Sequence, residues 1–323
     1  MYGSDADTNP HQPRPDLAEG AAKGSDSTMM SGMYAAISGL DANEAMLNNT
    51  ASDLANVNTV GFKAAHVSFA DSLTQVLRAS SGTTSTNGGT NPLQVGLGVQ
   101  VAATQNEMSE GAFQSTNTPL DIAIQGEGFL RVGAGAPPAA PPYTTGLPAN
   151  VDYTRAGDLT TNTKGFLTNQ SGLYLVGVNA EIENGAYKPG KEPSYIQVPP
   201  GSANVSIGQD GSVTYTDEEP ASPTYQQQVT AGYLTLAQFP NQAGLERLGG
   251  SLWAQTANSG NPVVGTPDTA GFGQTIGGEL EMSNVDLATE MTEMITAERG
   301  YQANSRVITT ANEMLDAAVS MVQ

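Results

Sequence analysis

Residues 284–322, with the sequence NVDLATEMTEMITAERGYQANSRVITTANEMLDAAVSMV, carry the clearest pattern in the chain. An apolar side chain recurs at every seventh position, which predicts a long helix with a seam of the coiled-coil type. Ser283 followed by Asp286 suits the start of that helix, because a hydroxyl cap and a carboxylate both favour the first turn. Ala297 and Ala311 belong to an adjoining line of small residues that would let a second helix approach closely. The predicted seam consists of Leu287, Met291, Met294, Tyr301, Ile308, Leu315 and Val322.

A second seven-residue repeat lies near the other end of the chain, in residues 31–57. It predicts a helix that pairs with the C-terminal one, and ordinary core packing is the alternative. Polar residues interrupt the neighbouring tracks, and we expect them to set the register at some cost in stability. These interruptions are Glu44, Glu298, Ser305 and Asn312. The N-terminal part of the seam consists of Met33, Ile37, Leu40, Leu47 and Leu54.

The stretch DLANVNTVGFK, residues 53–63, marks where the N-terminal helix should stop. Asparagines can end a helix through side-chain caps or a left-handed backbone, and a glycine can turn without a Cβ penalty. The aromatic ring that follows is expected to pack into the next domain or a neighbouring subunit. We therefore predict a helix-to-body junction that acts as a hinge, formed by Asn56, Asn58, Thr59, Gly61 and Phe62.

Residues 63–282 show no long helical period, and short apolar stretches recur there between turn signals. Asp210-Gly211, flanked by alternating apolar residues, predicts a β-hairpin. Residues 133–150, rich in Pro, Gly and Ala, are expected to form a projecting, mobile loop, and the polar residues 80–92 a linker.

Together these patterns predict an α+β fold, in which paired, coiled-coil-like N- and C-terminal helices flank an inserted, mainly antiparallel β-rich domain. Residues 1–28 carry Pro, Gly, Asp and Ser without periodicity and are predicted to be a disordered leader or tag; an export-related leader is the alternative. The predicted division is 1–28 for this leader, 29–62 for the N-terminal helix, 63–282 for the linker and β-rich domain, and 283–323 for the C-terminal helix.

The composition excludes several functional classes. The chain has 323 residues, a formal net charge of −20 and only 12 basic residues. Such a chain repels phosphate backbones and anionic lipids, so we expect no nucleic-acid binding. No apolar run reaches the ~18 residues of a membrane span, so we expect no membrane insertion. The absence of cysteine excludes disulfides and thiolate chemistry, and two histidines leave little for a catalytic triad or a His-rich metal site.

No motif points to catalysis, a cofactor or a metal. Asp217 to Glu219 could hold a calcium ion loosely, but such a run is more often a solvated loop. The G-x-G stretches do not continue to a phosphate-binding fingerprint. Trp253 is expected to be a core aromatic residue, with a ligand-stacking role as the alternative. We therefore predict no enzymatic activity, no cofactor, and no catalytic or metal-binding residues.

Four blocks of sequence resemble one family, the bacterial flagellar rod and hook proteins. They begin with MYAAISGLDANEAMLNNTASDLANVNTVGFK at residues 33–63 and end with the C-terminal signature at residues 278–315. Residues 91–132 and 234–260 are similar to the opening and close of the family's β domain. The resemblance implies a structural subunit that is exported unfolded, without a cleaved signal peptide, and then polymerises into a tube. Its terminal helices would form an inner assembly domain and its β-rich domain the outer layer.

The resemblance also implies partners and a location. We expect a homopolymer that contacts other axial proteins (rod, junction and cap) and the export apparatus, in the hook and basal body outside the cell. The stretches MYAAISGL and ERGYQANSRVITT favour a hook subunit, the flexible joint that transmits torque from motor to filament. A distal rod subunit is the alternative within the family. A secreted β-rich adhesin or a hydrolase is the alternative from another class.

Overall fold

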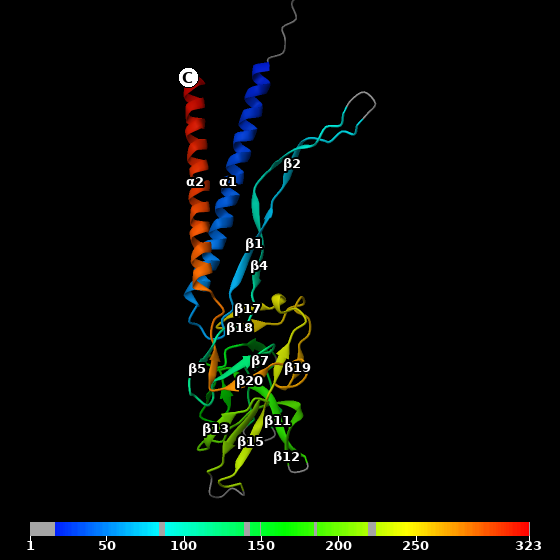
Figure 1. The fold of residues 1–323 in the computed structure, drawn as a ribbon, viewed down its shortest axis with the longest axis vertical. Coiled ribbons are helices and arrows are strands. Elements are labelled where there is room, and N and C mark those ends of the chain that lie inside the picture. Colours follow the sequence, from blue (N-terminus) through cyan, green and yellow to red (C-terminus); the bar gives the residue numbers. More distant parts are fainter. Residues whose placement is uncertain are drawn as a thin grey trace, which may run out of the picture. The chain divides into compact units, whose positions relative to one another are not determined.

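The computed structural model describes residues 17–83, 88–138, 143–148, 150–183, 186–218 and 224–322. Terminal helices in contact with each other and an antiparallel β-rich region between them in the sequence confirm the predicted α+β class (Figure 1). The chain divides into two compact units. The helical unit contains Met1–Asn48, Val67–Ala103 and Glu293–Gln323, and the β unit contains Asn49–His66 and Thr104–Thr292.

Helix α1 spans Leu17–Ala55 and begins earlier than predicted. The expectation of a disordered leader over residues 1–28 is wrong from Leu17 onward, and residues 1–16 lie outside the described part of the chain. Leu17, Ala18 and Ala21 favour helix, but Gly20 and Gly24 do not, so local propensity alone does not account for the early start. The helix continues upstream of the seven-residue repeat without a break.

Helix α2 spans Leu287–Val322, and Asp286 caps it. The Asp286 carboxylate accepts a hydrogen bond from the amide of Ala288 at 2.9 Å, which is the geometry of an N-cap. The Ser283 hydroxyl instead accepts from the amide of Val285 at 3.3 Å, so it stabilises the turn before the helix. The N-cap of α2 is therefore Asp286, and Ser283 lies before the helix.

A two-stranded arm belongs to the helical unit. Strands β2 (Thr74–Arg78) and β3 (Leu93–Gly96) pair antiparallel, and β1 (Ala65–Asp71) pairs with β4 (Val99–Asn106). The polar residues 80–92 were predicted as a linker; Ser81 and Thr90 form a bridge that continues this hairpin, and residues 84–87 lie outside the described residues. The Ser38 hydroxyl accepts from the amide of Val99 at 3.2 Å, which ties the base of the arm to α1.

The β unit contains a 13-stranded sheet with the main path β13–β14–β15–β11–β7–β8–β18–β17, while β9, β10, β12, β16 and β19 pair off this path. The strands on the path are β7 Phe129–Gly133, β8 Asp152–Thr154, β11 Tyr174–Glu183, β13 Ala203–Ile207, β14 Ser212–Thr216, β15 Gln228–Leu234, β17 Glu246–Gly249 and β18 Leu252–Ala254. The others are β9 Thr160–Thr161, β10 Leu167–Thr168, β12 Ala186–Tyr195, β16 Leu236–Gln238 and β19 Val263–Gly265.

Two further strand pairs and one short helix lie among the described residues of the β unit. The pairs are β5 (Phe113–Ser115) with β21 (Glu279–Glu281), and β6 (Ile122–Gln125) with β20 (Gln274–Gly277). A single 3-10 turn covers Gln242–Gly244. Both pairs join a strand near residue 120 to one near residue 280, so they bring the two ends of the β unit together.

The structure confirms the predicted hairpin between β13 and β14. These strands pair antiparallel on either side of Gly208–Gly211. Asp210 accepts from the amide of Ser212 at 3.1 Å, and Gly211 adopts a positive φ of 76° that a side chain would disfavour.

The loop at residues 133–150, expected to project, is partly bound to the β unit by hydrogen bonds. The Tyr195 hydroxyl donates to the carbonyl of Gly146 at 2.5 Å, and the Tyr195 amide donates to the carbonyl of Tyr143 at 3.1 Å. Residues 139–142 and 149 lie outside the described residues. Buried backbone groups need partners, and Tyr195 supplies two of them to this loop.

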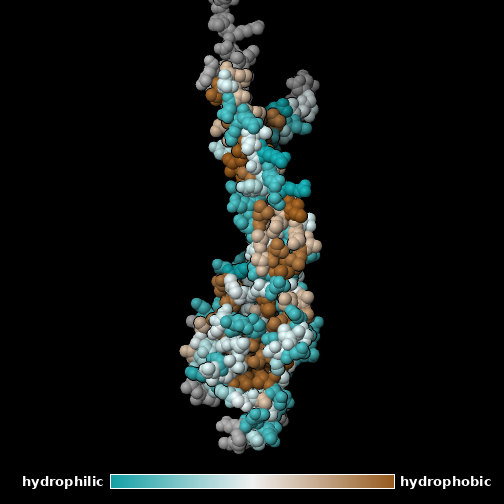
Figure 2. All heavy atoms as spheres, turned by 90° about the vertical axis from the view of Figure 1, so that its left-hand side faces the viewer, coloured by the Kyte–Doolittle hydropathy of each residue, from teal (hydrophilic) through white to brown (hydrophobic). Residues whose placement is uncertain are grey.

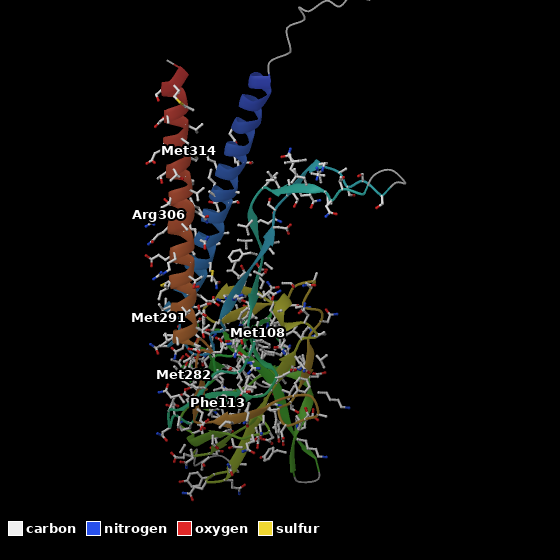
Figure 3. The ribbon with its side chains drawn as sticks, turned by 45° about the horizontal axis from the view of Figure 1, so that its top comes forward. Met108, Phe113, Met282, Met291, Arg306 and Met314 are labelled. Carbon is white, nitrogen blue, oxygen red and sulfur yellow. The ribbon has the colours of Figure 1, made fainter. Side chains whose placement is uncertain are left out.

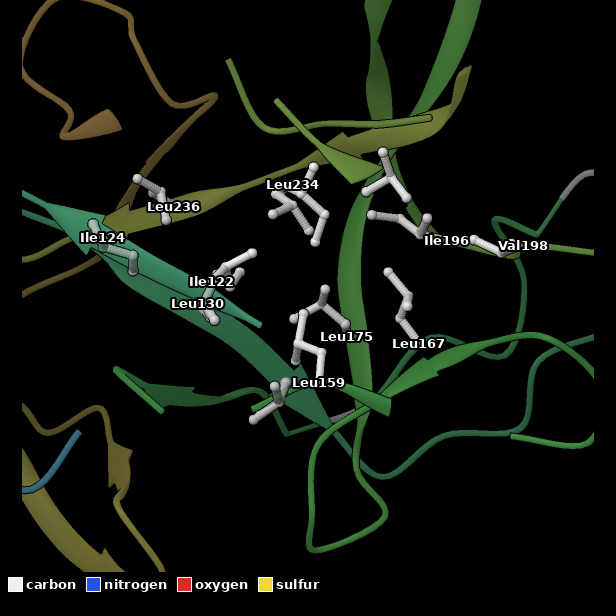
Figure 4. Packing of buried hydrophobic residues seen from close by; sticks show 13 residues of the cluster. Ile122, Ile124, Leu130, Leu159, Leu167, Leu175, Ile196, Val198, Leu234 and Leu236 are labelled. Carbon is white, nitrogen blue, oxygen red and sulfur yellow. The ribbon is translucent and has the colours of Figure 1, made fainter. Parts of the chain in front are cut away.

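Two apolar clusters form the core of the β unit. The larger is shown in Figure 4 and contains Ile122, Ile124, Leu130, Val132, Leu159, Leu167, Leu175, Ile196, Val198, Ile207, Val213, Leu234 and Leu236. The smaller contains Phe129, Tyr153, Ala237, Phe239, Leu245 and Trp253. Each fully buried side chain of this size contributes about 1.5–3 kcal/mol to the free energy of unfolding. The two clusters together give the β unit a core of its own.

Candidate functional site

The close contact between the two terminal helices is made by glycine and asparagine. A Cβ added to Gly39 would lie 2.5 Å from Nδ2 of Asn304, and one added to Gly300 would lie 2.5 Å from Oδ1 of Asn43. Because residue 39 meets 304 and residue 43 meets 300, the helices run antiparallel, as Figure 1 shows. The amide of Asn43 also donates to the carbonyl of Gly39 at 2.5 Å, which holds it in the contact. The side chains of Ala36, Ala42, Ala297 and Ala311 are buried.

The large residues of the predicted seam lie beside this contact or face solvent. Leu287, Met291 and Tyr301 are 45%, 52% and 41% exposed, and Ile37 is 41% exposed. The other described members are partly buried, namely Met33, Leu40, Leu47, Leu54, Met294, Ile308 and Leu315. The side chain of Val322 lies outside the described residues. Within one chain, the line of small residues makes the contact, and much of the large apolar surface is left over.

Exposed apolar side chains follow α2 along its length. Ile295, Met314 and Val319 are between 52% and 61% exposed, and Figure 2 shows hydrophobic patches on the face of the molecule along which α2 lies. Met291 and Met314, near opposite ends of the helix, are labelled in Figure 3. Exposed apolar surface of this extent marks an interaction site in a folded protein.

The arm carries a second exposed apolar surface. Leu73 is 72% exposed, and Val76, Leu77 and Leu93 are each between 51% and 53% exposed. Every residue of β2 and β3 is exposed. An isolated two-stranded hairpin is at best marginally stable in water, so this arm needs a surface to pack on.

In the β unit, the predicted junction begins with a side-chain stop at the end of α1. Asn56 Nδ2 donates to the carbonyl of Ser52 at 2.8 Å, and the Thr59 hydroxyl donates to Asn56 Oδ1 at 3.1 Å. Asn58 is exposed, and neither asparagine is among the residues with positive φ. Gly61 does have a positive φ of 65°, and a Cβ there would lie 2.5 Å from the amide nitrogen of Ala156. Gly61 is therefore required by both its backbone angle and its neighbours.

Phe62 is buried in the β unit, where its ring contacts the side chain of an arginine. It is 8% exposed, and the Arg247 guanidinium lies 4.8 Å from the centre of its ring. The same guanidinium lies 5.2 Å from the ring of Trp253 and donates to the carbonyl of Lys63. Trp253 is 1% exposed in the smaller apolar cluster, which fits the prediction of a core aromatic residue. Stacking between two rings gives Arg247 a partly desolvated cation–π setting.

A buried charged cluster follows directly after Phe62. Lys63, Arg155 and Glu281 are 1%, 3% and 0% exposed. Lys63 Nζ lies 2.5 Å from Glu281 Oε1, and Arg155 Nη1 lies 3.2 Å from Glu281 Oε2. Lys63 Nζ also donates to the carbonyl of Ser109 at 2.5 Å, and the amide of Gly111 donates to Glu281 Oε1 at 3.1 Å. Burial lowers the pKa of Lys63 below its ordinary value, and the Glu281 carboxylate partly offsets that effect.

Three further polar side chains hold the same segment. The buried Asp53 carboxylate accepts from the amide of Ala65 at 3.0 Å, and Asn49 Nδ2 donates to the carbonyl of Ala65 at 2.5 Å. Asn284 Oδ1 accepts from the amide of Ala64 at 2.8 Å, while its Nδ2 donates to the carbonyl of Glu107 at 2.9 Å. Motion within this segment would have to break these bonds, so they act as a clamp on the segment, and the hinge role stays a prediction.

Sequence reasoning missed the charged half of this junction. It named the helix stop and Phe62, but it did not name Asp53, Lys63, Arg155, Glu281 or Asn284. One signal was present: the chain has only 12 basic residues, and Lys63 directly follows the motif that ends the helix. Its partner could not be inferred, because 218 residues separate Lys63 from Glu281.

The described part of the acidic run that was considered as a calcium site lies in a loop of the β unit. Asp217 Oδ2 accepts from the Thr224 hydroxyl at 2.7 Å across the base of its loop, and Glu219 lies outside the described residues. Among the residues that the structure describes, no three His, Cys, Asp or Glu side chains gather as a metal site would require. In the same part of the chain, no helix has the length and apolar character needed to span a membrane.

Comparison with known proteins assigns the chain to a family. Models described as "Flagella basal body rod protein", "Flagellar hook protein FlgE/F/G D1 domain" and "Flagellar basal body rod FlgEFG protein C-terminal" match residues 33–63, 123–215 and 276–321. The flagellar basal-body rod protein FlgG of Bacillus subtilis is 34% identical over 294 residues, which cover 91% of this chain and 99% of that protein. The chain belongs to the flagellar rod and hook protein family.

Two other relatives, one rod protein and one hook protein, differ in their similarity to this chain, and the rod protein has the higher identity. FlgG of Agrobacterium fabrum is 34% identical over 287 residues, covering 88% of this chain and 97% of its own. The flagellar hook protein FlgE of Borreliella burgdorferi is 24% identical over 453 residues, covering 91% of this chain and all of its own. Among solved structures, Helicobacter pylori hook protein FlgE2 matches 60% of this chain and 47% of its own at 14% identity and a TM-score of 0.21, which is too distant to add to the assignment.

Membership of the rod and hook family settles the broad function. The chain is a structural axial subunit of the flagellum, located in the basal-body rod or hook, and it is not an enzyme. The alternatives of an adhesin or a hydrolase are thereby set aside. Family membership also implies polymerisation with other axial flagellar proteins.

Proposed function

We propose that this chain is a distal rod subunit of the flagellar basal body rather than a hook subunit. The observation that carries the proposal is the 34% identity to rod proteins FlgG along nearly the full length of both chains. The hook relative is 24% identical, and its alignment runs over 453 residues against the 323 of this chain. It therefore contains sequence that has no counterpart here. The preference for a hook subunit drawn from two short stretches is weaker than this full-length similarity.

The exposed apolar surfaces support self-assembly as the way in which such a subunit works. α2 exposes Met291, Ile295 and Met314, and the arm exposes Leu73 and Val76. A second copy of the chain is the most economical cover for these surfaces, because every copy offers the same complementary faces. The predicted seam residues then contribute between subunits rather than within one chain. Contacts with hook, junction or cap proteins and with the export apparatus belong to the same proposal.

Fractionation of purified hook–basal bodies tests the rod assignment. Hooks are sheared from basal bodies of the source bacterium, and both fractions are analysed by quantitative mass spectrometry. A rod subunit stays with the basal bodies, whereas a hook subunit leaves with the sheared hooks. Recovery of this chain mainly in the hook fraction would overturn the proposal. Electron microscopy of the purified chain under polymerising conditions tests self-assembly separately.

A further inference from the structure

The junction of the β unit joins two chain segments that are far apart in sequence. We call residues 56–65 the N-terminal crossing segment and residues 281–284 the C-terminal crossing segment. The amide of Gly61 donates to the carbonyl of Glu281 at 2.8 Å, and the amide of Ala64 donates to Asn284 Oδ1 at 2.8 Å. Lys63 places its buried ammonium 2.5 Å from the Glu281 carboxylate. Gly61, Lys63 and Ala64 of the N-terminal crossing segment therefore each bind a residue of the C-terminal crossing segment.

The two apolar clusters of the β unit contain no residue of either segment. The buried and partly buried members of its two apolar clusters run from Met108 to Phe272. Arg155 is held from within this core region, because it donates to the carbonyls of Ile124 and Gly126 at 3.3 and 2.7 Å. A folded body with Arg155 in place can therefore exist before either crossing segment is fixed.

Lys63 cannot take its place on that body alone. Without Glu281, its ammonium would be buried beside the Arg155 guanidinium with only a carbonyl group as its partner. An unpaired charge in such a place is strongly unfavourable. Even with the carboxylate present, burial keeps the pKa of Lys63 lowered. The carboxylate of Glu281 thus decides whether residues 61–65 can pack.

We propose that Glu281 is a completion latch: the N-terminal crossing segment becomes fixed only after residues 281–284 have joined the folded β unit. Chains are made from the N-terminus, so the N-terminal crossing segment exists long before its partner does. The end of α1 therefore stays unfixed in every incomplete chain, and a nearly complete chain is needed before the junction closes. This inference concerns folding of one chain and holds for a rod or a hook subunit alike.

Refolding of the full-length chain from urea, followed by pulsed hydrogen exchange with single-residue mass spectrometry, tests the order. The amide of Leu234, which donates to the carbonyl of Gly211 at 2.8 Å, reports the body. The amides of Gly61 and Ala64 report the latch. We expect Leu234 to become protected first, and Gly61 and Ala64 to follow together in a later phase at least tenfold slower. Protection of Gly61 and Ala64 before or together with Leu234 would overturn the proposal.

Variants of the latch give an independent check at equilibrium. In Glu281→Gln, the exchange of Gly61 and Ala64 is expected to accelerate at least tenfold more than the exchange of Leu234. Glu279→Gln, on the same strand, is the matched control and should leave all three amides unchanged. Asn284→Ala removes the acceptor of Ala64 at a half-buried position and should expose that amide without unfolding the body. Retained protection of Gly61 and Ala64 in Glu281→Gln would contradict a latch.

Discussion

Gly39 of α1 faces Asn304 of α2 so closely that a methyl group on Gly39 would lie 2.5 Å from the asparagine side-chain nitrogen. The close approach of the two helices thus requires a residue without a side chain at position 39. We expect Gly39→Leu to force the helices apart at an overpacking cost of about 1–3 kcal/mol. Gly32→Ala is the control, since a Cβ there meets nothing within 4 Å. It should raise helix stability by roughly 0.5–1 kcal/mol. Circular dichroism during urea unfolding measures both, and equal effects would contradict the contact.

Removal of the Glu281 carboxylate should be the most damaging single change at the junction. Glu281→Ala leaves Lys63 and Arg155 buried without their common partner, and breaking a buried pair in this way costs about 3–5 kcal/mol. Lys63→Met should cost less, because the Arg155–Glu281 pair survives it. Trp253 is the single tryptophan of the chain, so its fluorescence during urea unfolding reports each free energy. A larger loss in Lys63→Met than in Glu281→Ala would contradict the assigned role.

Gly61→Ala should destabilise the β unit through two separate effects. Its φ of 65° disfavours a side chain by about 1–2 kcal/mol, and its Cβ would lie 2.5 Å from the backbone of Ala156. Gly172 has a comparable φ of 77° but open space around it, so Gly172→Ala measures the backbone effect alone. We expect the Gly61 variant to lose clearly more free energy of unfolding than the Gly172 variant. Equal losses would mean that Ala156 can move aside freely.

Stability should depend on pH through Asp158. Burial raises the pKa of the Asp158 carboxyl above 3.8, and the nearby Asp121 adds to this effect. The folded state therefore holds this proton more tightly than the unfolded state. The resulting stabilisation is full below pH 3.8 and is lost as the pH rises through the folded-state pKa.

Asp158→Asn tests that sign. The variant should be more stable than the parent at pH 7, and its advantage should shrink as the pH falls toward 3.8. Asp268→Asn, at an exposed position, should change stability by no more than about 0.5 kcal/mol. Urea unfolding over a pH series measures the differences. An advantage that grows on acidification would show that the sign is wrong.

Polymerisation should fail when charge is placed on the exposed side of α2. Tyr301 is 41% exposed in the single chain, and we expect its ring to be covered by a neighbouring copy in the polymer. Tyr301→Asp should abolish polymers seen by electron microscopy while Trp253 fluorescence shows an intact β unit. Tyr301→Phe keeps the ring and should still polymerise. Normal polymers from the aspartate variant would remove Tyr301 from the proposed interface.

The helices and the hairpin were predictable because their signals are local. A seven-residue repeat and a Gly at a tight turn depend on neighbours in sequence, and both were recovered in the structure. The contact between Gly39 and Asn304 was not, since a pattern search follows large apolar residues and this contact depends on small ones. The pairing of Lys63 with Glu281 also escaped, because no local property of one residue identifies a partner 218 residues away. The early start of α1 at Leu17 was missed because residues 17–28 show no apolar periodicity and contain two glycines.

The clamp also defines a route for mechanical force within the β unit. Tension on the end of α1 reaches Gly61 along the backbone and passes to Glu281 through one hydrogen bond and, by way of Lys63, one ion pair. From Glu281 it reaches the start of α2 within six residues, since that helix begins at Leu287. Gly61, Lys63 and Glu281 belong to none of the strands of the 13-stranded sheet. Loops of the sheet can therefore lengthen or change sequence without altering the path that carries the load.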